Sequence, residues 1–160
     1  MIVENLLCST KSYENLCEIL KKEVRVIECD LRRFGFHGLY RKKKNDRGSI
    51  YIEESLTIEK KKEYLFEEYA HHLTSSGNIL DQSTLESRVQ ETIARNKALD
   101  MSITIDNIQS YLKNGVADYK EIASHLGFTA EYVEKGILRL IQKQIDISEY
   151  RRMEIANYGN

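Results

Sequence analysis

The sequence predicts an α+β protein, in which a small antiparallel sheet of about three strands packs against a long helix and a helical C-terminal part follows. Three observations lead to this prediction. Segments that suit β-strands occur only between residues 24 and 56. From residue 57 onward, apolar side chains recur at the three- and four-residue spacing of amphipathic helices. The chain contains no proline, which is consistent with a mostly helical fold.

The N-terminal part is expected to form one helix and then three strands. Apolar residues at Leu16, Ile19 and Leu20 predict a helix over residues 12–22. The segment VRVIECDL alternates well enough to form the first strand. FGFHGLYRKK and SIYIEESL are expected to be two further strands of a hairpin, because the sequence from Asn45 to Gly48 between them has the residues of a turn.

The helical part is expected to begin with a helix over residues 58–73, which has Thr57 as its N-cap and an apolar stripe through Leu65, Tyr69 and Leu73. Further helices are predicted over residues 83–98, 105–114, 119–126 and 130–142, and the polar tail after Ser148 is expected to fray. We therefore divide the chain into an α+β domain (1–100), a helical subdomain (101–148) and a tail (149–160).

Length and composition exclude several classes of protein. With 160 residues the chain is long enough for one ordinary domain, and a formal net charge of -1 gives no global attraction to nucleic acid or acidic membranes. No apolar run is long enough to span a bilayer, and the N-terminus lacks the pattern of a signal peptide. Three cysteines without a C-x-x-C pair fit reduced thiols, so we expect a cytoplasmic protein.

The segment FEEYAHHLTSSGNILDQ, residues 66–82, contains the residues with the clearest chemical potential. On a helix, Glu67 and His71 share a face and could bind one metal ion, with Glu68 displaced to the side. In metallopeptidases with H-E-x-x-H, the residue at that offset position is the general base. Glu68 and His72 form a second, geometrically equal pair, so spacing alone does not select between them. A solvated, charged helix face is the alternative interpretation of all four residues.

A metal site would need a third ligand, which we expect on the next helix. Glu91 is the best candidate, because the chain can turn near Gly77 and run back alongside the first helix, and Glu86 is a weaker one. Zinc accepts carboxylate as well as imidazole ligands, so a glutamate at position 67 does not exclude it. A ligand set richer in carboxylates shifts the preference toward harder ions such as manganese.

The chain resembles the ImmA/IrrE family of metallopeptidase-like proteins, in particular the branch of prophages and mobile elements in which E-E-x-x-H-H replaces H-E-x-x-H. The resemblance covers about residues 12–141. It is carried by GLYRKK, SIYIEESLT, KKEYLFEEYAHHLTSSGNILDQ, QETIARNKA and YKEIASHLGFTAEYVEKGI, and EEYAHHLTSSGNI and ETIARNKA are its most specific parts. The sequence departs from the family at Glu67, which stands in place of histidine, and at Ala70, where glycine is common.

The resemblance implies a function and a role for each residue. It implies a zincin-like active-site helix on which Glu67 and His71 are metal ligands and Glu68 is the catalytic glutamate, with Glu91 as the third, acidic ligand. His72 would be a neighbour of the site rather than a ligand. The implied metal is zinc, with manganese as the alternative. The implied substrate or binding partner is a cytoplasmic helix-turn-helix transcriptional repressor.

The segment DYKEIASHLGFTAEYVEKGILRL has the rhythm of a helix-turn-helix, with Gly127 at the turn and Thr129 as the cap of the second helix. Acidic residues at Glu131 and Glu134 would face DNA phosphates unfavourably. We therefore expect a hairpin that packs on the core or docks a partner, and do not expect direct DNA binding.

The basic run from Arg41 to Lys44 is interpreted as a solvated turn, with contact to an acidic partner surface as the alternative.

Two histidines outside the cluster, His37 and His125, have no companion at ligand spacing and are expected to be structural or on the surface.

The sequence as a whole suggests three functions, in order of preference. The first is a metal-dependent endopeptidase-like protein that cleaves or inactivates a repressor. The second is a non-catalytic module that binds a repressor, and the third is a DNA-binding regulator.

Overall fold

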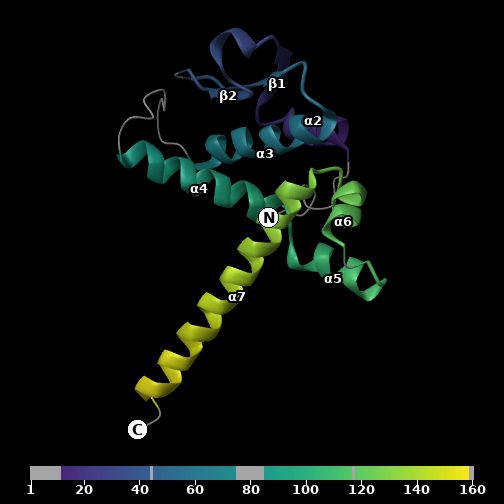
Figure 1. Cartoon of the computed structure of the whole chain (residues 1–160). Coiled ribbons are helices and arrows are strands. Elements are labelled where there is room, and N and C mark those ends of the chain that lie inside the picture. The colour runs from purple at the N-terminus through teal and green to yellow at the C-terminus, as the bar shows by residue number, and fades with distance from the viewer. Residues whose placement is uncertain (1–11, 44, 75–84, 117, 159–160) are drawn as a thin grey trace.

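The structure is a computed structural model that describes residues 12–43, 45–74, 85–116 and 118–158, without the side chains of residues 85–87 and 145–158. It confirms the α+β class (Figure 1). The elements are α2 (Tyr13–Leu20), β1 (Arg25–Cys29), the 3-10 helix η1 (Arg32–Phe34), β2 (Gly38–Arg41), β3 (Ser49–Glu53), α3 (Ile58–Thr74), α4 (Leu85–Ser102), α5 (Ile105–Lys113), α6 (Tyr119–Leu126) and α7 (Ala130–Tyr158).

The three-stranded sheet is mixed rather than wholly antiparallel, which corrects the prediction from the sequence. The strand order is β1-β3-β2, with β2 antiparallel and β1 parallel to β3. The hairpin of β2 and β3 forms as predicted, but β3 is inserted between β1 and β2. Burial explains the order, because Ile50 and Ile52 of β3 are both 0% exposed and belong at the centre of the sheet. Strand alternation alone does not reveal which strand is central.

The buried carboxylate of Glu53, at the end of β3, holds the loop between β1 and β2. It accepts hydrogen bonds from the backbone N–H groups of Leu31 (2.5 Å) and Arg32 (3.0 Å) and from the hydroxyl of Ser55 (2.6 Å). The bond from the Ser55 hydroxyl, followed by the backbone bonds and Arg32, lowers the pKa of Glu53 to about 2, against the opposing effect of burial. These bonds fix the path of the chain into β2.

Helix α3 is the central element of the molecule. It lies under the sheet and alongside α4, and it also contacts α2 (Figure 1). Leu65, Phe66, Tyr69 and Ala70 are buried in a core that is continuous from α2 through the sheet to the C-terminal helices. The side chains of α3 therefore meet the sheet, α4 and the C-terminal part at the same time.

The C-terminal hairpin of α6 and α7 is attached to α3 by two charged side chains. Gly127 ends α6 in the left-handed conformation, with φ of 68°. Lys62 Nζ donates to the carbonyl oxygen of Leu126 at 2.6 Å and lies 4.1 Å from the centre of the Phe128 ring. Next to it, Glu63 accepts a hydrogen bond of 2.7 Å from the backbone N–H of Thr129. The hairpin thus packs on the core.

Helix α7 is longer than the sequence predicts. It continues to Tyr158, through the segment that we expected to be a polar tail, and its second half extends away from the rest of the molecule (Figure 1). Within the residues that the structure describes, no helix is both long and apolar enough to cross a membrane.

Candidate metal centre

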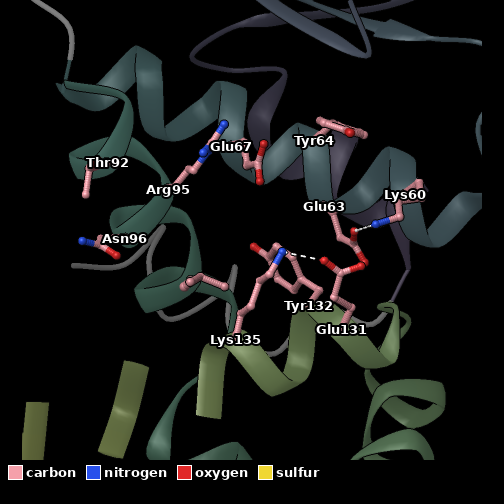
Figure 2. A pocket seen from close by; sticks show the side chains of 11 residues that line it. Lys60, Glu63, Tyr64, Glu67, Thr92, Arg95, Asn96, Glu131, Tyr132 and Lys135 are labelled. Atoms are coloured by element: carbon pink, nitrogen blue, oxygen red, sulfur yellow. Dashed lines mark hydrogen bonds and ion pairs between the residues drawn. The ribbon is translucent and has the colours of Figure 1, made fainter. Parts of the chain in front are cut away.

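The four cluster residues of α3 divide between two faces of the helix. Glu67 and His71 face α4, where His71 Nε2 lies 3.3 Å from Oε2 of Glu91 and Glu67 lies beside Arg95 (Figure 2). The contact between His71 and Glu91 is sheltered, because the two side chains are only 15% and 26% exposed. The structure therefore brings together the pair and the third residue that the sequence singled out. Spacing alone left this pairing open.

His72 lies on the other face, next to the edge strand β2. Its Nδ1 is 2.9 Å from the hydroxyl oxygen of Tyr40, and its ring stacks on that of Tyr69 with centroids 5.7 Å apart. The hydroxyl of Tyr69 in turn donates to Glu23 at 2.6 Å. Burial, and secondly the positive charge of Lys42, lower the pKa of His72. His72 thus helps to attach β2 to α3.

Glu68 lies between these two faces, against the backbone of β2. A Cβ atom built on Gly38 would lie 2.8 Å from both Cγ and Oε1 of Glu68, so a glycine at this position gives the carboxylate its room. Burial raises the pKa of Glu68 to about 7, although the positive charge of His71 and the backbone amide of Tyr40 oppose the shift. A carboxyl group with a pKa near neutrality can both accept and donate a proton at physiological pH.

The other three residues, Glu67, His71 and Glu91, shift one another's pKa values. Burial, together with the negative charges of Glu91 and Glu63, raises the pKa of Glu67 against the opposing effect of Arg95. Burial disfavours the charged form of His71, but the hydrogen bond to Glu91 and the surrounding carboxylates raise its pKa overall. The bond from His71 lowers the pKa of Glu91. The carboxylates of Glu67, Glu68 and Glu91 surround the imidazole of His71, and an additional positive charge would stabilise them.

The donor set is compatible with a metal ion, although these side chains are not arranged around one. Among the described residues, no three His, Cys, Asp or Glu side chains are placed to hold a metal. Glu91 instead binds His71 and, at 3.0 Å, Arg95. The fit rests on chemistry, because one imidazole and two carboxylates on facing helices are ligands that zinc accepts, and a cation would relieve the repulsion between Glu67 and Glu91.

Other residues considered from the sequence either lie outside the described part of the chain or are not among the contacts of this centre. The side chain of Glu86 is outside the described residues, as are Cys8 and Lys44. Cys17 and Cys29 are free, and burial raises the pKa of Cys17 to about 11, which makes its thiol unreactive. The remaining basic residues of the hairpin, Arg41, Lys42 and Lys43, are exposed.

Three residues were not predicted from the sequence to lie near α3 or the centre. Tyr40 and His37 approach α3 from the edge of the sheet, and the ring of His37 lies 5.2 Å from that of Tyr64, centroid to centroid. No local spacing could have found them, because strand and helix meet only in the folded chain. Arg95 could have been found, since it stands four residues after Glu91 on one helix, the spacing of an ion pair.

Comparisons of the chain with protein-family models, with curated proteins and with solved structures found no match. A function for this chain is therefore inferred from the residues of the site and the motifs of the sequence.

Proposed function

We propose that this protein is a metal-dependent, endopeptidase-like protein that cleaves or inactivates a cytoplasmic helix-turn-helix repressor. The observation that carries the proposal is the convergence of Glu67 and His71 of α3 with Glu91 of α4, next to a Glu68 whose pKa is raised to about 7. Titratable groups with shifted pKa values that gather in one place are typical of active sites. The repressor as substrate comes from the resemblance of the sequence motifs alone.

Glu67, His71 and Glu91 would hold the metal, which we propose to be zinc, with manganese as the alternative. Such an ion would supply a Lewis acid and lower the pKa of water. To take part, His71 must be neutral, so its hydrogen bond to Glu91 would be exchanged for a bond to the ion. Arg95, which also binds Glu91, would then orient that carboxylate from the second side.

Glu68 is the proton carrier in this proposal. As a carboxylate it takes a proton from the attacking water, and as an acid it passes the proton to the leaving amine. Its raised pKa suits both steps at neutral pH, and the backbone of β2 at Gly38 limits the positions that its side chain can take. Glu68 is thus held on the side of the cluster opposite to α4.

One observation favours a second candidate function, a non-catalytic module that binds the repressor. Glu91 already has two partners, His71 and Arg95, so the cluster is partly satisfied as an ordinary ion-pair network. Networks of this kind also shift pKa values. In that case the peptidase fold would serve only as a binding surface.

Direct DNA binding is the least favoured function. In a DNA-reading hairpin, the first turns of the second helix would have to reach the bases. Here Glu131, Tyr132 and Lys135 of α7 instead line a pocket with α3 and α4. Helix α7 is also held at its start by the bond between Thr129 and Glu63.

The deciding experiment measures metal by elemental mass spectrometry on protein purified without chelator or a metal affinity tag. We expect about one equivalent of zinc or manganese per chain, lost in His71→Ala and in Glu91→Ala but kept in Glu59→Ala, an exposed control on the same helix. Wild-type protein that holds neither ion after reconstitution would refute the peptidase proposal and favour the binding module. Cleavage of the repressor, abolished by Glu68→Gln, would then separate a catalyst from a metal-containing binder.

A further inference from the structure

A pocket of about 580 Å³ with a mixed polar and apolar lining lies between α3, α4 and the first turns of α7 (Figure 2). It begins beside Glu67, so it is continuous with the candidate metal centre. Its volume is in the range of small-molecule and peptide-binding sites. The lining residues are Lys60, Glu63, Tyr64, Glu67, Thr92, Arg95, Asn96, Leu99, Glu131, Tyr132 and Lys135.

The charges of the pocket are balanced, with three cations and three carboxylates in the lining. Two ion pairs account for four of them, since Lys60 Nζ lies 2.8 Å from Glu63 and Lys135 Nζ lies 2.6 Å from Glu131. Arg95 binds Glu91 at the edge of the pocket. Glu67 makes no hydrogen bond or ion pair with another described residue, and Figure 2 shows its carboxylate at the wall of the pocket.

We propose that this pocket is a specificity site that binds a polar, uncharged side chain of the peptide substrate, such as glutamine or asparagine, beside the bond that is cleaved. The proposal rests on the proposed peptidase function, because it places the substrate next to Glu67. It adds the chemical class of the residue that is recognised and assigns the recognition to α7 as well as to α3 and α4.

The balanced charges of the lining favour an uncharged polar side chain over a wholly apolar or a charged one. An apolar side chain would remove water from charged and hydroxyl groups without replacing their hydrogen bonds. A charged side chain would find an equal number of like and opposite charges, so it would gain little in exchange for its lost hydration. An amide carries both a donor and an acceptor, and it can bond to Glu67 or Asn96 without a change of charge.

The pocket also gives a role to the helix-turn-helix-like hairpin. Helix α7 supplies Glu131, Tyr132 and Lys135, and Tyr132 is fixed by the bond between its hydroxyl and Ser102 Oγ, 3.0 Å away. The attachment of Lys62 and Glu63 to the turn of the hairpin then sets the width of the pocket. The C-terminal subdomain would complete the substrate site rather than read DNA.

The test uses the full chain and capped pentapeptides of alanine in which the central residue is glutamine, asparagine, leucine, lysine or glutamate. Binding is followed by NMR through the side-chain amide signal of Asn96 and the backbone signal of Thr92, which needs no catalysis. We expect the glutamine and asparagine peptides to bind about tenfold more tightly than the leucine peptide, since an unmatched polar site rejects ligands that lack its hydrogen bonds.

Charge-changing variants test whether the two sides of the pocket act as proposed. Lys135→Glu should move the preference to the lysine peptide, and Glu131→Lys should move it to the glutamate peptide. The double exchange, Lys135→Glu with Glu131→Lys, keeps the charge balance and should restore the preference for glutamine. Lys120→Glu, on the exposed surface of α6, is the control for a change in net charge and should have no effect.

The outcomes distinguish this inference from the proposed function. If the peptides shift Asn96 with the expected preference but neither they nor a repressor is ever cleaved, the pocket stands and the peptidase function fails. If a repressor is cleaved and neither Lys135→Glu nor Glu131→Lys changes the rate, the peptidase function stands and the pocket inference is overturned. It is also overturned if no peptide shifts Asn96 or Thr92 at millimolar concentration.

Discussion

The two halves of α3 bury charged side chains in different ways. In the first half, Lys62 and Glu63 are 1% and 4% exposed, and each is bonded to a backbone group of the C-terminal hairpin. In the second half, Glu67 and Glu68 are sheltered among other acidic groups, and their pKa values are raised. The first half of the helix therefore uses buried charge to hold the fold, whereas the second half holds partly buried carboxyl groups whose charged form is disfavoured.

This difference shows how a structural charge can be told from a functional one. A buried charge that is bonded to a fixed backbone donor or acceptor stabilises one conformation. Because its hydrogen bonds are already made, it is not available for chemistry. A buried carboxylate beside other carboxylates costs stability and is retained where chemistry needs it. The variants below test this division of α3, from the largest expected effect to the smallest.

The largest effect is expected from Glu68→Gln, which removes the proton carrier but keeps the size of the side chain. Under the proposed function, kcat/KM for repressor cleavage should fall by about 100-fold or more. The fold should not lose stability, because a neutral amide suits a site that already favours the protonated acid. Glu59→Gln, exposed on the same helix, is the control. Undiminished cleavage by Glu68→Gln would remove Glu68 from the mechanism.

Lys62→Ala should give the largest loss of stability, about 3 kcal/mol, because it removes a buried side chain and the hydrogen bond to Leu126. Chemical denaturation of the variant and of Lys120→Ala, an exposed lysine of α6, would measure the difference. If the loss is as small as in Lys120→Ala, then Lys62 does not hold the hairpin as the structure indicates.

The same lysine should give the wild type a dependence of stability on pH. Burial lowers the pKa of Lys62 to about 8 from the ordinary value of 10.5, so above pH 8 the unfolded chain binds the proton that the folded chain has lost. The free energy of unfolding should therefore rise from about pH 8, by about 1 kcal/mol per pH unit at most. The rise should be absent from Lys62→Ala. Measurements should stop near pH 9, because Cys17 above about pH 9, and Tyr13 and Tyr132 above about pH 10, oppose the rise, since burial raises their pKa values.

Gly136→Ala tests the other attachment of the hairpin, where α7 crosses α4. A Cβ atom at this position would lie 2.7 Å from Cβ of Ile103, closer than packed atoms come. We expect a net loss of about 1 kcal/mol in the free energy of unfolding, because overpacking costs more than the gain in helix propensity returns. A double-mutant cycle with Ile103→Ala should show that the two changes are coupled. Additive effects would mean that the contact is not as close as described.

The sequence predicted best what depends on local patterns. The hairpin around residues 45–48, the helix with Leu65 and Tyr69 on its buried stripe, and Gly127 at the turn all follow from short-range periodicity and turn chemistry. Leu73, the third residue expected on that stripe, is 43% exposed near the end of the helix. The contact between His71 and Glu91, on two different helices, also agrees with the expected position of Glu91. The spacing on α3 left two registers open, and only the resemblance of the sequence motifs selected Glu67, His71 and Glu91.

What the sequence did not reveal depends on contacts between distant segments. The parallel pairing of β1 with β3, the approach of His37 to Tyr64 and the pocket between Glu67 and Lys135 each join elements that share no local pattern. The continuation of α7 to Tyr158 was missed for another reason. Its polar composition resembles that of a frayed tail, although residues with good helix propensity occur throughout it.

The smallest effect on stability, below about 1 kcal/mol, is expected from Gly38→Ala, since the added Cβ meets only the movable end of the Glu68 side chain. This variant is useful because it should change the pKa of Glu68. In the wild type, the stability that the protonated carboxyl contributes is complete below its unfolded pKa of 4.5 and is lost as the pH rises through about 7. A methyl group that pushes the carboxylate toward solvent should lower this pKa and reduce that loss. Carboxyl ¹³C NMR would measure the titration of Glu68 directly, with Glu59→Ala, an exposed position on the same helix, as the control. If the pKa of Glu68 is the same in Gly38→Ala as in the wild type, β2 does not set the environment of this carboxyl group. The raised pKa values in the second half of α3 would then have to come from the contacts between α3 and α4 alone.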